Sequence, residues 1–381
     1  PFSVTMEMAP SLFGDGLHLL RIGLMGDVIP VEERIPANLV FLIDVSGSMS
    51  HGDNKLPLVK FMLKQLVNVL RPSDTLGIVV YAGTDAVLLN PTPVNDKSAI
   101  IDGIDALSAG GSTAGAAGIT TAYQLAAANM MEGGINRVIL CTDGDFNVGL
   151  TGDSLIEMIE DYRDTGVSLS VFAFGTGNLN DQYMEQLADH GNGNYAYVDS
   201  QNEALHIIGD KLVSTLQIIA KDVKVQVEFN PANVLRYRLV GYENRLLNNE
   251  DFNDDTVDAA EIGAGHNVTA FYEVELADSL SADRISQCRF RYKQPDGDTS
   301  ILITQDVFAE DTLDTFEEAS ADFRFAAAVV EYAEILRHSM HSEGAQFDVV
   351  ASVASDSVNV DHPEALEFLD LVDIASGLWN Q

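Results

Sequence analysis

Apolar runs and amphipathic stretches alternate along the chain between residues 37 and 216. Short apolar runs of strand-like composition occur at 39–43, 75–81, 86–89, 137–142, 167–174 and 195–198. Between them, apolar residues recur at helical spacing at about 55–70, 97–107, 115–131, 153–165, 180–190 and 201–216. Such alternation is typical of βαβ units. The pattern therefore predicts an α/β domain with a doubly wound, mostly parallel, Rossmann-like sheet.

The segments on either side of this domain have other periodicities. Apolar and polar residues alternate with period two at 223–229, 268–276, 287–293 and 300–307, which predicts an antiparallel β-sandwich over residues 217–309. Residues 1–36 contain strand-like runs at 2–8 and 17–24 without a helix to cover them. We expect these N-terminal strands to pair with the sandwich, so that the α/β domain is inserted into the sandwich sequence.

The last part of the chain, residues 310–381, returns to helical spacing. One helix is predicted at 316–338 and a second near 363–378. The sequence therefore predicts four parts, which cover residues 1–36, 37–216, 217–309 and 310–381.

Candidate chemistry is concentrated at the ends of two predicted core strands. The segment Asp44-Val45-Ser46-Gly47-Ser48 follows the strand at 39–43, and Asp143 follows the strand at 137–142. A glycine-rich loop at 110–115 contains Ser112 and Thr113 and opens a helix. Oxygen ligands suit hard divalent cations, and the carboxyl ends of parallel strands are where α/β sheets bind ligands.

We therefore predict a divalent-cation site with two carboxylates and three neutral hydroxyls. Its ligands, direct or through water, are Asp44, Ser46, Ser48, Thr113 and Asp143, and Ser112 is an alternative to Thr113. Mg²⁺ is favoured, with Ca²⁺ and Mn²⁺ as alternatives. Neutral hydroxyl ligands leave the cation electrophilic and short of one ligand.

The order of these motifs resembles a known family. D-x-S-x-S, then a threonine in a glycine-rich loop, then T-D-G after a strand is similar to the metal-ion-dependent adhesion site of von Willebrand factor A domains, over roughly residues 37–216. The resemblance implies that the five residues named above hold the metal. It also implies that an acidic side chain of a protein partner completes the coordination.

Three further stretches, 144–149, 191–197 and 241–245, resemble bacterial envelope proteins of the YfbK type. This resemblance implies a place in the cell envelope, in the periplasm or at the cell surface. The chain begins at Pro1, and we expect a signal or lipoprotein segment to have been removed from it. Contact with the membrane is then expected only through that missing N-terminal anchor.

The net charge limits the classes of partner. The chain has 58 acidic and 21 basic residues, for a formal net charge of −37, and nucleic acid or an anionic membrane surface would repel it. Its two cysteines, Cys141 and Cys288, fall in different predicted domains, so no disulfide is expected. No apolar run reaches the roughly 18 residues needed to cross a bilayer.

These observations favour a metal-dependent protein-binding module, in adhesion or interaction, without catalytic residues, an organic cofactor or a small-molecule substrate. One alternative is a structural envelope component that does not use the cation site. Another is a metal-dependent phosphohydrolase with Asp44 as nucleophile. The sequence argues against the enzyme, because Ser46 stands where such enzymes usually place a second aspartate and no lysine follows in a fitting context.

Overall fold

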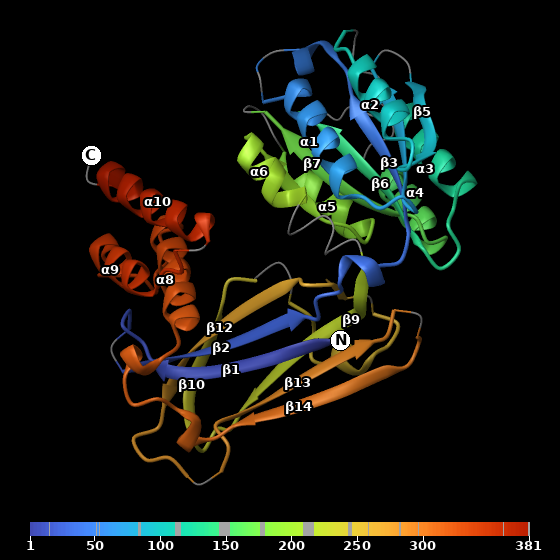
Figure 1. Cartoon of the computed structure of the whole chain (residues 1–381). Coiled ribbons are helices and arrows are strands. Elements are labelled where there is room, and N and C mark those ends of the chain that lie inside the picture. The colour runs from blue at the N-terminus through green and yellow to red at the C-terminus, as the bar shows by residue number, and fades with distance from the viewer. Residues whose placement is uncertain are drawn as a thin grey trace. The chain divides into compact units, whose positions relative to one another are not determined.

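The structure is a computed structural model, and the whole chain is drawn in Figure 1. It describes residues 1–14, 16–50, 52, 54–82, 85–110, 116–144, 153–175, 180–208, 217–242, 246–257, 259–281, 283–295, 297–360 and 362–379. Among these residues, no helix is both long and apolar enough to cross a membrane.

The chain divides into two compact units. One contains Val28–Ile218 with Gly263–Gly265, and the other contains Pro1–Asp27, Ile219–Ile262 and His266–Gln381. The finer division into four domains stays a prediction.

The Val28–Ile218 unit is built on a six-stranded sheet with the order β5-β4-β3-β6-β7-β8. Its strands are β3 (Ala37–Asp44), β4 (Thr75–Tyr81), β5 (Asp85–Pro93), β6 (Ile135–Thr142), β7 (Ser168–Phe174) and β8 (Tyr195–Val198). Only β4 and β5 pair antiparallel, and the other pairs are parallel. The predicted α/β fold with a doubly wound, mostly parallel sheet is confirmed.

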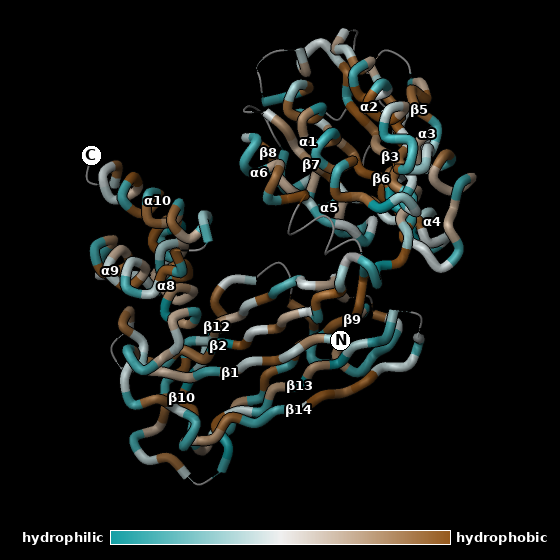
Figure 2. The backbone as a smooth tube through the Cα atoms, in the orientation of Figure 1, coloured by the Kyte–Doolittle hydropathy of each residue, from teal (hydrophilic) through white to brown (hydrophobic). Residues whose placement is uncertain are grey.

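Helices cover both faces of this sheet, and its central strand β3 is therefore buried on both sides. Every residue of β3 is buried, with Leu39, Phe41 and Ile43 in one core cluster and Val40 and Leu42 in the other. The first cluster draws on α1 (Leu56–Val69), α2 (Lys97–Ala106) and α6 (Gln201–His206). The second draws on α3 (Ala116–Ala128), α4 (Asp153–Asp164) and α5 (Asp181–His190). In Figure 2, hydrophobic residues predominate along strands such as β3 and β6, and hydrophobic and hydrophilic residues are mixed along the helices of this unit.

Strand β3 lies at the point where the strand order reverses. The chain goes from β3 to β4 and β5 on one side, and then returns to β6 on the other side of β3. In α/β sheets, the crevice for a ligand lies outside the carboxyl ends of the strands at such a point. Here those ends belong to β3 and β6, which carry the candidate metal-site residues.

The other unit contains two four-stranded sheets. The first has the order β1-β2-β12-β10, and the second has the order β11-β9-β13-β14. The strands are β1 (Phe2–Pro10), β2 (Leu17–Gly26), β9 (Ile218–Phe229), β10 (Val234–Val240), β11 (Ala260–Gly263), β12 (Asn267–Leu276), β13 (Ser286–Lys293) and β14 (Ser300–Val307). Strand β2 pairs antiparallel with both β1 and β12, so that strands from before and after the Val28–Ile218 segment share one sheet.

The C-terminal region differs from the predicted pair of helices. It contains α8 (Ala321–Leu336), α9 (Phe347–Ser357) and α10 (Pro363–Trp379), so α9 was missed. The prediction of one helix over 316–338 was wrong at its start. Ser320 caps α8 by accepting a hydrogen bond from Phe323 N at 3.1 Å, and Phe316–Glu318 form a separate 3-10 turn.

Candidate metal centre

The loop after β3 holds its own carboxylate in place. Asp44 is the last residue of β3 and is fully buried. The backbone N–H of Ser46 donates to Asp44 Oδ1 at 2.8 Å, and the hydroxyls of Ser46 and Ser48 are hydrogen-bonded at 2.9 Å. Ser48 lies in a short 3-10 turn, Gly47–Ser50. The D-x-S-x-S spacing thus places one carboxylate and two hydroxyls together through local geometry alone.

The second carboxylate comes from the neighbouring strand. Strands β3 and β6 are parallel and in register, with Ile43 opposite Cys141, so Asp143 enters the site next to Asp44. The backbone N–H of Gly144 donates to Thr142 Oγ1 at 3.2 Å in the turn that follows. Burial raises the pKa of Asp44 and the charge of Asp143 raises it further, whereas hydrogen bonds from Ser46 lower it. The two carboxylates therefore repel each other in a buried place.

Each of these carboxylates has one buried oxygen without a hydrogen-bond partner in the part of the chain that the structure describes. These atoms are Asp44 Oδ2 and Asp143 Oδ1. An unsatisfied buried polar atom costs about 1–3 kcal/mol, and more when it is charged. A hard divalent cation would satisfy both oxygens at once, because its preferred ligands are carboxylates and hydroxyls. The donor set therefore fits the cation predicted from the sequence.

Thr113 and its alternative Ser112 lie outside the described residues, so their part in the site stays a prediction. Among the described residues there is no group of three or more His, Cys, Asp or Glu side chains that could hold a metal.

Two further side chains reach the site that the sequence analysis did not include. Tyr81, the last residue of β4, lies opposite Asp44 in the sheet and is fully buried. Burial and the charge of Asp44 raise the pKa of its phenol. Lys55 Nζ lies 2.9 Å from Asp143 Oδ2. Lys55 is thus a lysine at the site that the sequence analysis did not place there.

A local signal for Lys55 was present in the sequence. It stands at the start of the helix predicted at about 55–70, after the D-x-S-x-S loop, and a short polar side chain is the usual choice at the N-cap of a helix. Tyr81 gave no such signal, because an aromatic residue at the end of a core strand is ordinary.

Comparison with known proteins shows the family of this chain. The von Willebrand factor type A domain profile matches residues 38–211, and the profile described as "Uncharacterized protein YfbK, C-terminal" matches residues 214–287 and 275–378. "Uncharacterized protein YfbK" of Escherichia coli (strain K12) is 38% identical over 99% of this chain and 68% of its own length. The chain belongs to the YfbK family. Its A domain is of a type that is often a metal-dependent protein-interaction module.

A further curated protein matches part of this chain, and a solved structure matches its fold. A UPF0353 protein of Mycobacterium sp. (strain KMS) is 30% identical over 50% of this chain, which spans 63% of that relative's length. A solved structure, von Willebrand factor type A from Catenulispora acidiphila, superposes with a TM-score of 0.51 at 14% identity. The superposition covers 93% of this chain and 86% of the solved chain. It supports the fold of this YfbK-family chain.

Proposed function

We propose that this chain is a metal-dependent protein-binding module of the bacterial cell envelope. The observation that carries the proposal is the pair of buried carboxylate oxygens, on Asp44 and Asp143, that lack hydrogen-bond partners in the described structure beside two serine hydroxyls. Asp44, Ser46, Ser48, Thr113 and Asp143 would hold the cation, with Mg²⁺ favoured over Ca²⁺ and Mn²⁺. When bound, the cation supplies an electrophilic position for a carboxylate oxygen of a partner protein.

The charge of the chain supports a bridging role for the cation. At a formal net charge of −37, an acidic partner is repelled at long range, and salt screens this repulsion beyond about 8 Å at physiological ionic strength. An acidic side chain therefore needs a local positive charge in order to bind. The proposed place in the envelope, in the periplasm or at the cell surface, follows from the resemblance to envelope proteins of the YfbK type.

Calorimetric titration of the chelator-treated chain with Mg²⁺, Mn²⁺ and Ca²⁺ tests the metal site. We expect one saturable site in the wild type and its loss in Asp143→Asn, which keeps the shape of the side chain but removes its charge. Asp105→Asn is the matched control, because Asp105 is 56% exposed and pairs with Lys64 away from the site. Weak uptake of many ions that neither substitution changes would contradict the proposal.

The carboxylate-binding step has its own probe. With Mn²⁺ bound, water on the ion relaxes solvent protons, and a carboxylate that replaces this water lowers the relaxation rate. We expect N-acetylglutamate amide to lower the rate and N-acetylglutamine amide, its neutral counterpart, to leave it unchanged. Equal effects of the two compounds would argue against recognition of an acidic side chain.

The two alternatives make different predictions. A structural envelope component would form stable assemblies that are indifferent to a chelator, as sedimentation would show. A phosphohydrolase gains some support from Lys55 beside Asp143. Against it, Ser46 occupies the position where such enzymes usually have an acid/base aspartate. Metal-dependent hydrolysis of p-nitrophenyl phosphate that is abolished in Asp44→Asn would favour the enzyme.

A further inference from the structure

Lys55 brings a positive charge into the candidate metal centre. Its Nζ lies 2.9 Å from Asp143 Oδ2, and the side chains of Lys55 and Asp143 are 18% and 3% exposed. Lysine is rarely withdrawn from solvent unless it is paired. The ion pair joins residues 88 positions apart in the sequence, at the start of α1 and at the end of β6.

The position of Lys55 is unfavourable for the helix that it precedes. Lys55 is the N-cap of α1, and its side chain makes no capping hydrogen bond. Short polar residues are preferred at an N-cap, and a cation is disfavoured at the positive end of a helix dipole. A residue that breaks a local preference is expected where a tertiary contact compensates. The contact here is the Asp143 carboxylate.

Gly175 leaves space for the Lys55 side chain. It follows β7 directly with φ +87°, a conformation that favours glycine. A Cβ at this position would lie 2.7 Å from Lys55 Cε and 2.9 Å from Lys55 Cγ, which is closer than real Cβ contacts. Helix α1, strand β6 and the end of β7 together therefore hold the ammonium at the site.

We infer that Lys55 is a built-in counter-cation that sets the affinity of the metal centre for divalent cations. This inference rests on the proposed function. The ammonium neutralises Asp143, so the site attracts a divalent cation less strongly. An ammonium and a divalent cation that share one carboxylate also repel each other. A divalent cation must therefore either displace Lys55 from Asp143 or bind against its charge. The lysine makes the site a weaker cation binder than its two carboxylates alone would be.

The test compares the wild type with four variants by calorimetric titration with Mg²⁺ and Mn²⁺. Lys55→Met keeps the apolar stem without the ammonium, and Lys55→Gln is a second neutral variant that can still donate a hydrogen bond to Asp143. Lys55→Arg keeps the charge. Lys64→Met is the matched control, because Lys64 is on the same helix but forms an exposed pair with Asp105 at 2.6 Å.

We expect both neutral variants to bind each cation about tenfold or more tightly than the wild type. Lys55→Arg should bind within roughly threefold of the wild type because it keeps the charge, and Lys64→Met should be unchanged. In a chelator, Lys55→Met should melt at a lower temperature than the wild type, because the two carboxylates lose their counter-cation. Saturating Mg²⁺ should then raise its melting temperature by more than it raises that of the wild type.

The outcomes separate this inference from the proposed function. Equal dissociation constants for the wild type and both neutral variants, with saturable binding in each, would overturn the role of Lys55 and leave the metal site intact. Saturable binding only in the neutral variants would support the charge effect of Lys55 and contradict the proposed function, in which the wild type binds the cation. No saturable binding in any of the five proteins would overturn both.

Discussion

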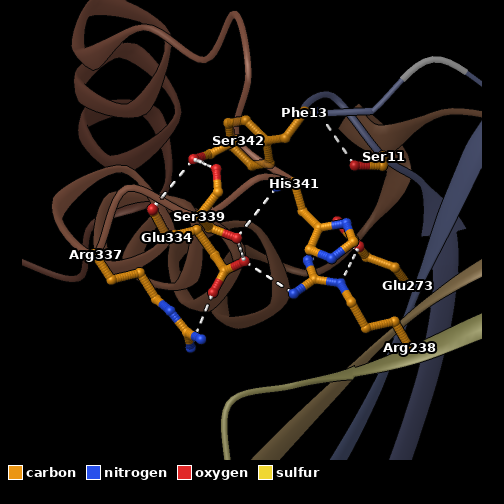
Figure 3. A network of polar contacts seen from close by, with 9 residues as sticks. All are labelled: Ser11, Phe13, Arg238, Glu273, Glu334, Arg337, Ser339, His341 and Ser342. Atoms are coloured by element: carbon orange, nitrogen blue, oxygen red, sulfur yellow. Dashed lines mark hydrogen bonds and ion pairs between the residues drawn. The ribbon is translucent and has the colours of Figure 1, made fainter.

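Arg238 of strand β10 lies 2.9 Å from Glu334 of helix α8, measured from Nη1 to Oε2 (Figure 3). The same guanidinium lies 2.6 Å from Glu273 of β12 through Nη2, and the Ser339 hydroxyl donates to Glu334 Oε2 at 2.7 Å. The side chain of Glu334 is only 4% exposed. The first C-terminal helix is therefore joined to its sheet by a shielded charge network in addition to the apolar contacts of Phe323 with Phe271.

Arg238→Met should destabilise this unit by about 3 kcal/mol, because it leaves the buried Glu334 carboxylate without its main cation. Calorimetric unfolding of the intact chain measures the change. Arg236→Met is the matched control, since Arg236 is on the same strand and pairs with Glu275 but is 73% exposed. Its effect should stay within about 1 kcal/mol. Equal effects of the two substitutions would show that the shielding of the network has no energetic consequence.

Glu331→Gln should remove a pH dependence of stability. Burial, together with the charges of Glu273 and Glu334, raises the pKa of Glu331 from 4.5 to about 7, against the opposing effect of Arg238. The folded state therefore keeps this proton at pH values where the unfolded chain has lost it, and the free energy of unfolding falls as pH rises from 4.5 to about 7. Above that range the variant should be more stable than the wild type, by up to ~3 kcal/mol.

Urea unfolding at pH 5 and pH 8 measures this effect. At pH 5 the wild type and Glu331→Gln should differ little, and at pH 8 the variant should have the higher midpoint. Glu317→Gln, at an exposed position, removes the same charge and is the control. If Glu331→Gln were the less stable protein at pH 8, the carboxylate would be stabilising the fold and the predicted sign would be wrong.

Gly193→Ala should destabilise the α/β unit by ~3 kcal/mol, in the upper range for overpacking. A Cβ at Gly193 would lie 1.7 Å from the carbonyl oxygen of Leu169, which belongs to β7 and has no room to move within the sheet. Gly377→Ala in α10 is the control, because nothing lies within 4 Å of its added Cβ. It should be neutral or stabilising by up to ~1 kcal/mol. Thermal unfolding of both variants gives the comparison.

Replacing Ser46 and Ser48 together by alanine should weaken cation binding by about tenfold or more, because two neutral ligands are lost. Ser48→Thr keeps a hydroxyl and should retain most of the affinity. The control is Ser98→Ala, since Ser98 is exposed and donates to Asp96 outside the site. Calorimetric titration with Mn²⁺ reports the affinities. An unchanged dissociation constant in the double variant would assign the cation to other ligands.

The elements predicted well from the sequence are those whose apolar pattern is read locally. Strands β3 and β6 were predicted because each is a short apolar run between polar turns, and α1 because its apolar residues recur at helical spacing. Strand β10 was missed although Leu235 to Leu239 alternate apolar and polar residues, and its arginines at 236 and 238 find their partners only in the folded unit. Helix α9 was missed because it is only 11 residues long and its N-cap residue, Gln346, makes no side-chain capping hydrogen bond.

For the candidate site, the sequence by itself determined what spacing along the chain can determine. Asp44, Ser46 and Ser48 lie within one turn of each other, so their convergence is a local property of the loop. The tertiary structure decided the rest. Parallel pairing of β3 with β6 brings Asp143 beside Asp44, and the start of α1 carries Lys55 to the same carboxylate. Contacts over such separations depend on strand register and on the packing of distant elements, and periodicity along the chain contains no information about either.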